Sequence, residues 1–209
     1  MFSRLFALLL ACGAVIGSAQ AAETAADKAI CATAIAAAEQ AARLPVRLLR
    51  AVSLAESGRW DPEQKASFSW PWTVTSGGAG QFFPDKATAI AHVKKLQAKG
   101  VKNIDVGCMQ VNLMHHGQAF TDLEEAFDPI HNALYAAAFL KELRVERNSW
   151  SGAVATYHSA DPERGGTYSD KVFALWHKEN EREFKAALAA REALYAGRAT
   201  ARQNQLAQR

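Results

Sequence analysis

The chain has 209 residues, enough for one domain with a full hydrophobic core but too few for two of ordinary size. Apolar residues make up 49% and charged residues 22%, which is typical of a globular protein and argues against a disordered chain. The formal net charge is only +3 and no run of Lys and Arg occurs, so no nucleic-acid partner is expected.

The N-terminal residues have the pattern of a secretory signal peptide. Arg4 is followed by the apolar run 5–16 and then by small residues that end at Ala21. This pattern predicts a signal peptide over residues 1–21 and export to the periplasm. The apolar run is too short to span a membrane. The alternative is lipoprotein processing at Cys12, which is disfavoured because it leaves an unusually short apolar segment.

Removal of the signal peptide leaves two cysteines, Cys31 and Cys108. In an oxidising compartment an even number of cysteines favours one disulfide, which would link the first helix to the segment around residue 108. The alternative is a pair of buried free thiols. A bridge that closes a loop of this length contributes roughly 4 kcal/mol to the free energy of unfolding in the chain-entropy model.

Two helices are expected near the start of the mature chain. Apolar residues at helical spacing predict a helix over residues 25–42. A second helix is expected over residues 45–57, because Pro45 suits a first helical position and Gly58 suits the residue after the last turn. Glu56 then lies in the last turn of this second helix.

Glu56 is a candidate general acid. It shares a helical face with Leu49 and Val52, so apolar neighbours would disfavour its ionised form by desolvation. The partial negative charge of the helix C-terminus acts in the same direction. Its pKa would then rise from about 4.3 toward neutrality, as a general acid requires. The alternative is an ordinary helix-end glutamate in contact with water.

The rest of the chain combines a small β element with further helices. The predicted elements are, in chain order, a hairpin over 70–83, a helix over 84–99, a strand broken by a glycine over 103–112, and helices over 128–143, from Ser149 and from Tyr168. The polar, Gln-rich residues 197–209 are expected to be a disordered tail. The predicted fold class is therefore mainly α, with a single α+β domain over residues 22–196.

Three short motifs occur in order along the chain. They are Ala55-Glu56-Ser57-Gly58, Val106-Gly107-Cys108-Met109-Gln110-Val111-Asn112 and Ala153-Val154-Ala155-Thr156-Tyr157-His158-Ser159. Together they resemble the lytic transglycosylases with a soluble-lytic-transglycosylase domain, a goose-type-lysozyme-like fold that cleaves peptidoglycan. The resemblance covers residues 31–176, and three ordered motifs are far more specific than any one of them. It implies a lysozyme-like α+β fold.

The resemblance also implies roles for individual residues. Glu56 would be the catalytic acid and base, with the Tyr157 hydroxyl near it. The residues implied in binding substrate are Ser57, Gly107, Met109, Gln110, Asn112, Tyr157 and His158. Gln110 would either bond the sugar or hold the cleft in shape. His158 stands where the family often has asparagine, and the alternative for it is a purely structural role.

The reaction implied by the resemblance is cleavage of the MurNAc-β-1,4-GlcNAc bond without addition of water. Glu56 would protonate the leaving oxygen and then accept the proton of the MurNAc C6 hydroxyl, which leaves a 1,6-anhydroMurNAc end. A hydrolytic muramidase needs a second carboxylate, for which Asp61, Glu63 and Asp105 are candidates, although no pattern places any of them opposite Glu56. A non-catalytic peptidoglycan-binding or assembly protein is a third interpretation.

The expected partner is the glycan strand of peptidoglycan, and envelope-spanning flagellar or secretion machinery is a further candidate. We expect a monomer. No cofactor and no metal are expected, because the chain has no His-Glu-x-x-His pattern and only two mature cysteines. Trp70 and Trp72 in the predicted hairpin either stack on sugar rings or pack in the core.

Overall fold

The structure is a computed structural model that describes residues 13–207, with side chains from residue 26 onward. The predicted signal peptide and the alternative processing at Cys12 depend on residues 1–12 and on side chains that lie outside the described part of the chain. Within the described part, no helix has both the length and the apolar composition needed to cross a membrane.

The protein is mainly helical, with a small β element, as the sequence predicts. The described helices are α1 (Gly13–Ala42), α2 (Leu48–Ser57), α3 (Lys86–Ala98), α4 (Leu123–Ala126), α5 (Pro129–Arg147), α6 (Trp150–His158) and α7 (Pro162–Ala207). The described strands are β1 (Gly58–Asp61), β2 (Ala66–Ser69), β3 (Thr73–Thr75), β4 (Gln81–Phe82), β5 (Asp105–Val106) and β6 (Val111–Asn112).

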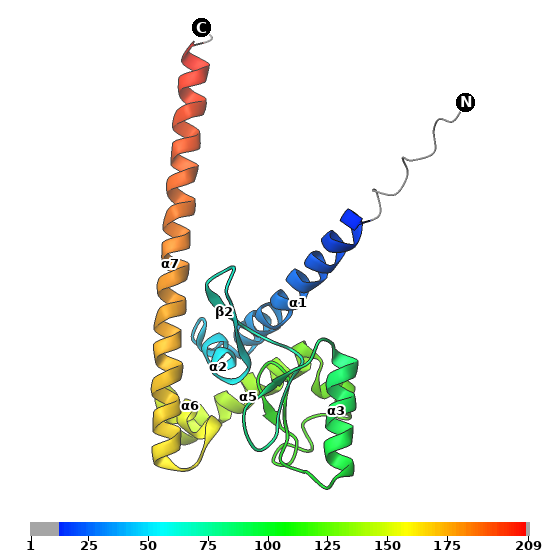
Figure 1. The fold of residues 1–209 in the computed structure, drawn as a ribbon. Coiled ribbons are helices and arrows are strands. Elements are labelled where there is room, and N and C mark those ends of the chain that lie inside the picture. Colours follow the sequence, from blue (N-terminus) through cyan, green and yellow to red (C-terminus); the bar gives the residue numbers. More distant parts are fainter. Residues whose placement is uncertain (1–12, 208–209) are drawn as a thin grey trace, which may run out of the picture.

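The helices enclose the larger apolar core. Helices α1 and α6 pack on α5, while α2 and α6 pack on the first part of α7. Their inward faces bury Leu48, Val52, Ala137 and Leu140 completely. Burial of a large aliphatic side chain contributes roughly 2 kcal/mol, so these contacts fix α2 at the centre of the domain. Figure 1 shows α2 beside α7 and next to the β1-β2 hairpin, with α3 on the other side of the molecule.

The strands form two antiparallel sheets. One has the order β4-β3-β5-β6, and the other is the β1-β2 hairpin. The predicted glycine-rich hairpin is confirmed as β3-β4, in which Val74 pairs with Gln81. The sequence does not predict the β1-β2 hairpin, because Pro62 and the charged residues around it are typical of a loop. Trp70 and Trp72 are buried in a second apolar core under these strands, so they pack rather than stack on sugars.

The C-terminal region differs from the prediction. The sequence predicts disorder beyond Gly197, but α7 continues without interruption to Ala207. Alanine, arginine, leucine and glutamine dominate this segment, and all have high helix propensity, so one internal glycine costs only about 1 kcal/mol. Every residue from Ala189 to Ala207 is exposed. Figure 1 shows this part of α7 (orange to red) extending beyond the domain.

Candidate active site

Helix α2, which carries Glu56, begins at Leu48, later than the sequence predicts. The backbone N–H groups of Arg47 and Arg50 both donate to the carboxylate of Glu39, at 3.1 Å each. An acidic group at a helix N-terminus satisfies donors that have no partner within the helix and complements the helix dipole. A carboxylate from α1 therefore sets where α2 begins.

The end of α2 depends on Gly58, which follows the last turn as predicted. A side-chain carbon at this position would overlap the carbonyl oxygen of Leu54. Only glycine therefore allows the chain to leave the helix directly after Ser57 and start strand β1. This sharp exit keeps Glu56 in the final turn of the helix.

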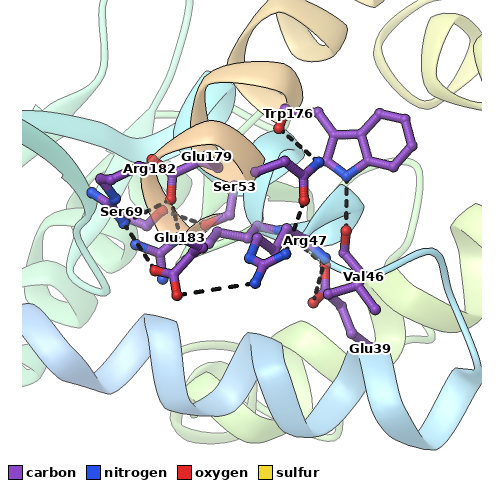
Figure 2. A network of polar contacts seen from close by, with 11 residues as sticks. Glu39, Val46, Arg47, Ser53, Ser69, Trp176, Glu179, Arg182 and Glu183 are labelled. Carbon is purple, nitrogen blue, oxygen red and sulfur yellow. Dashed lines mark hydrogen bonds and ion pairs between the residues drawn. The ribbon is translucent and has the colours of Figure 1, made fainter. Parts of the chain in front are cut away.

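A polar network holds α7 against α2 (Figure 2). Glu179 is 5% exposed and accepts hydrogen bonds from Arg50 of α2, at 2.5 Å, and from Arg182, at 2.8 Å. Nearby, the Trp176 indole N–H donates to the Val46 carbonyl at 2.8 Å. A buried carboxylate needs such hydrogen-bond partners to offset the loss of contact with water. The network thereby fixes the distance between the two helices that build the site.

The carboxyl group of Glu56 is largely enclosed, with 15% of its side chain exposed. Burial raises its pKa from 4.5 to about 7, and the negative charge of Asp105 adds to this rise. A hydrogen bond from Tyr168 and the charge of Lys171 act in the opposite direction. Glu56 can therefore hold a proton near neutral pH and also release it, as an acid and base must.

Tyr168, in the second turn of α7, is the direct partner of Glu56. Its hydroxyl donates to Oε1 of Glu56 at 2.5 Å. The sequence predicts Tyr168 only as the start of the last helix. The sequence does contain an indication of this contact, because a tyrosine on the buried face of a helix needs a hydrogen-bond partner for its hydroxyl.

His158 packs against the ring of Tyr168. The two rings stack with their centres 4.3 Å apart. Nδ1 of His158 is 4.0 Å from Oε1 of Glu56. Burial lowers the pKa of His158, and the positive charges of Arg164 and Lys171 lower it further, which favours the neutral ring at neutral pH. His158 therefore lines the site and supports Tyr168 without forming a strong ion pair with Glu56.

Tyr157 lines the same cleft as Glu56, but its hydroxyl bonds elsewhere. It donates to the carbonyl oxygen of Met109 at 2.9 Å. The hydroxyl that bonds the acid is thus that of Tyr168, while Tyr157 lies near enough for the Glu56 charge to raise its pKa, in agreement with its predicted position near the acid. Tyr157 ties α6 to the turn between β5 and β6.

Gly107 allows the chain to form that turn. It has a φ of +82°, and a side-chain carbon there would lie 2.6 Å from Nδ2 of Asn132. Asn132 is fully buried, donates to the carbonyls of Val106 and Ala126, and accepts from the Met109 N–H. The glycine is required so that Asn132 can reach these groups. None of the sequence motifs includes Asn132.

Gln110 has a structural role in the wall of the cleft. Its Oε1 accepts from the Thr75 hydroxyl at 2.5 Å, and its Nε2 donates to the carbonyls of Thr73 and Gly107 at 3.1 Å and 3.0 Å. Both ends of the amide are therefore engaged within the protein. Of the two predicted alternatives, these contacts favour holding the cleft in shape over bonding the sugar.

Ser57 and Met109 do not reach the cleft. Their side chains are 1% and 0% exposed. The Ser57 hydroxyl donates to the carbonyl oxygen of Cys108 at 2.7 Å, while Met109 packs in the larger core. Neither is placed to touch a substrate, in contrast to what the resemblance implies. The presence of these two residues in the motifs therefore reflects a structural role, which is to anchor the turn between β5 and β6 to α2.

The predicted disulfide between Cys31 and Cys108 is present. It links α1 to the turn between β5 and β6, across 77 residues of sequence. Because the Cys108 carbonyl also accepts from Ser57, the turn is attached to both α1 and α2. The alternative of two free thiols is contradicted.

These elements enclose a cleft of about 930 Å³. Of the residues predicted for the site, the cleft is lined by Glu56, Gln110, Asn112, Tyr157 and His158. One wall is the glycine-rich loop of the β3-β4 hairpin, with Gly78 and Gly80 at its tip, and the other comes from α5, α6 and α7. Within the described chain, no cluster of three His, Cys, Asp or Glu side chains could hold a metal ion.

Asp105 is the second carboxylate of the cleft. Pairing of β5 with β6 places it opposite Asn112, whose Nδ2 donates to Oδ1 of Asp105 at 2.8 Å. Burial raises the pKa of Asp105, and the hydrogen bond from Asn112 lowers it. The other two candidates lie outside the cleft. Asp61 is buried against Lys28 at 2.7 Å, and Glu63 is exposed.

A family model described as Transglycosylase SLT domain matches residues 33–165, a range that contains all three motifs. The curated proteins and the solved structures compared with the chain include no significant match. The family match covers more than half of the sequence, and the chain therefore belongs to the SLT-domain transglycosylases.

Proposed function

We propose that the protein is a peptidoglycan lytic transglycosylase that cleaves the MurNAc-β-1,4-GlcNAc bond and leaves 1,6-anhydroMurNAc ends. The observation that carries this proposal is the state of Glu56. Its carboxyl group opens into a large cleft, yet burial raises its pKa to about 7. A carboxyl group with such a pKa is suited to give and regain a proton at neutral pH.

In the first step, Glu56 donates its proton to the glycosidic oxygen as the bond from that oxygen to C1 of MurNAc breaks. The carboxylate that forms keeps its hydrogen bond from Tyr168. A hydrogen bond to a charged acceptor is worth about 1.5–3 kcal/mol, more than one to a neutral carboxyl group. Tyr168 therefore stabilises the charge that develops on Glu56.

In the second step, the C6 hydroxyl of the same MurNAc attacks C1, and its proton passes to the Glu56 carboxylate. The proton lost in the first step is thereby regained, and no water is added. Both reacting groups belong to one sugar, so the step benefits from proximity. Only one carboxyl group is needed.

Asp105 supports a second candidate function, a hydrolytic muramidase on the same fold. It lines the same cleft as Glu56 and is close enough for its charge to raise the pKa of Glu56. In this alternative Asp105 would activate water or act as the nucleophile. We favour the transglycosylase because it matches the family and requires no second carboxylate.

The test is digestion of purified sacculi, with analysis of the products by mass spectrometry. We expect anhydro-muropeptides from the wild type and none from Glu56→Gln. The matched control is Glu63→Gln, which removes an exposed carboxylate outside the cleft and should leave activity unchanged. Absence of anhydro products from the wild type, or equal activity of Glu56→Gln, would contradict the proposal. Binding of sacculi without turnover would favour the non-catalytic alternative.

We also propose a periplasmic location for a monomeric enzyme. The family acts on peptidoglycan, and the Cys31–Cys108 disulfide suits an oxidising compartment. Association with flagellar or secretion machinery stays a prediction from the sequence. Cell fractionation combined with thiol labelling tests the location, since a cytosolic protein with two reduced cysteines would contradict it.

A further inference from the structure

The cleft does not end at Glu56. A second hollow of about 440 Å³ shares Glu56, His158 and Arg164 with the cleft and is lined by the first turns of α7. The residues around this hollow are Ala55, Glu56, His158, Glu163, Arg164, Thr167, Tyr168 and Lys171. A substrate in the main cleft therefore has room for a substituent on the far side of the acid.

Two positively charged side chains lie at this end of the cleft. Among the described residues, Arg164 and Lys171 are the only Arg or Lys side chains that line either hollow. They lie seven residues apart on α7, with Thr167 between them, so all three share one face of the helix. We call this face, with the hollow that it lines, the basic pocket.

The two cations differ in how they are held. Lys171 donates to the Ala55 carbonyl at 2.9 Å, at the end of α2. In the described part of the chain, no side chain pairs with the Arg164 guanidinium. Of the residues that the structure describes, Glu163 is the one carboxylate in the pocket besides Glu56, which is largely protonated below pH 7. The pocket thus carries a net positive charge when the acid is protonated.

The chemistry of the glycan strand indicates which group this charge would bind. The sugar rings of GlcNAc and MurNAc are neutral. Anionic groups are carried by the 3-O-lactyl arm of MurNAc, either as its own carboxylate or as carboxylates of an attached stem peptide. An acid that acts at the MurNAc glycosidic bond lies next to a residue that carries this arm.

We propose that the basic pocket binds a carboxylate on the lactyl arm of MurNAc, with Arg164 as its main ligand. This inference rests on the proposed function, because it takes peptidoglycan as the substrate. Arginine suits the role because its planar guanidinium forms paired hydrogen bonds with carboxylates. The pocket would thereby distinguish MurNAc-containing strands from neutral chitin-like glycans.

The test measures glycan binding by the full mature chain in a Glu56→Gln background, so that substrate is not consumed. Arg164→Gln removes the proposed ligand. Lys178→Gln is the matched control, since it removes an exposed cation of the same helix that does not line either hollow. Three probes are compared: uncrosslinked glycan with stem peptides, the same glycan after amidase treatment, which exposes the lactyl carboxylate, and a neutral GlcNAc hexamer.

We expect Arg164→Gln to weaken binding of the anionic glycans about three- to tenfold and to leave the hexamer unchanged, while Lys178→Gln affects none of the probes. The difference should shrink at high salt, because the interaction is charge-dependent. Loss only with stem-bearing glycan assigns the stem carboxylates, and loss with the amidase-treated glycan assigns the lactyl carboxylate. No loss with either, or an equal loss with the hexamer, would overturn the inference.

A kinetic measurement separates this inference from the proposed function. With Glu56 intact, Arg164→Gln should raise KM for sacculi and leave kcat nearly unchanged, since Arg164 takes no part in proton transfer. Normal KM in a variant that forms anhydro products would overturn the inference and leave the transglycosylase intact. A wild type that forms no anhydro products would instead overturn the proposed function.

Discussion

The hydroxyl of Tyr168 donates a hydrogen bond to Oε1 of Glu56 across 2.5 Å, although the two residues are 112 positions apart in the chain. The contact forms where α7 docks on α2, and the Arg50–Glu179 ion pair is one of the contacts between these two helices. The protonation of the candidate acid therefore depends on how two helices dock.

Replacement of Tyr168 by phenylalanine should shift the pH dependence of the enzyme upward. The Tyr168 hydrogen bond lowers the pKa of Glu56, so its loss leaves the carboxyl group protonated to a higher pH. The descending limb of kcat/KM, expected near pH 7 in the wild type, should move to higher pH. The rate at the optimum should fall about tenfold, because the carboxylate loses a charge-assisted hydrogen bond. A pH profile identical to that of the wild type would contradict this role.

Replacement of Asp105 by asparagine should shift the same limb in the opposite direction. The Asp105 charge raises the pKa of Glu56, so a neutral side chain lets Glu56 ionise at lower pH. Under the transglycosylase mechanism, anhydro products should still form. If Asp105→Asn instead abolished all turnover at every pH, the muramidase alternative would gain support.

Glu56→Gln should stabilise the protein at alkaline pH. The folded state raises the pKa of Glu56 from 4.5 to about 7, so it binds the proton more tightly than the unfolded chain does. Stability is therefore lost as pH rises between these values, by about 3 kcal/mol at most. The Glu56→Gln variant has no ionisable group at this position, so its stability does not fall over this pH range. Its Tm should exceed that of the wild type at pH 8 and match it near pH 4.5, and a difference that does not vary with pH would contradict the linkage.

Loss of the disulfide should destabilise the domain without removing any cleft residue. The bridge closes a loop across 77 positions, which corresponds to about 4 kcal/mol in the chain-entropy model. The double variant Cys31→Ser/Cys108→Ser should show this decrease in urea unfolding. Adding a reductant should destabilise the wild type to a similar extent and leave the variant unchanged, and insensitivity of the wild type would count against the bridge.

Truncation after Ala189 should leave the domain intact. Each residue from Ala189 to Ala207 is exposed, whereas the contacts that hold α7 lie before it, at Trp176, Glu179 and Arg182. We expect unchanged Tm and unchanged digestion of soluble glycan. A truncation after Trp176 is the contrasting variant, because it removes Glu179 and should destabilise the domain. A large loss of stability on truncation after Ala189 would contradict the division of α7 into a docked part and an exposed part.

Local sequence signals predicted much of the fold. Gly58 and the Asp128–Pro129 pair are helix boundary signals, and both mark real helix ends. The glycine-rich hairpin and the Cys31–Cys108 bridge are also present. Helix ends and tight turns depend on residues that are neighbours in the sequence, and the disulfide was predicted from the number of cysteines. A single sequence contains both kinds of information.

Features that depend on tertiary packing were harder to predict. Ser57 lies next to Glu56 in sequence, yet it points to the Cys108 carbonyl and away from the cleft. Tyr168 meets Glu56 only through the docking of α7, and Asp105 enters the cleft only through the pairing of β5 with β6. The spacing of motifs along the sequence does not say how far apart two such segments lie in the folded protein.

The measurement that tests the central claim most directly is digestion of sacculi in oxygen-18 water, followed by mass spectrometry of the released muropeptides. If Glu56 acts alone as acid and then base, the new MurNAc ends are in the anhydro form and carry no heavy oxygen. New reducing ends labelled with oxygen-18 would contradict the transglycosylase and identify water as the attacking group.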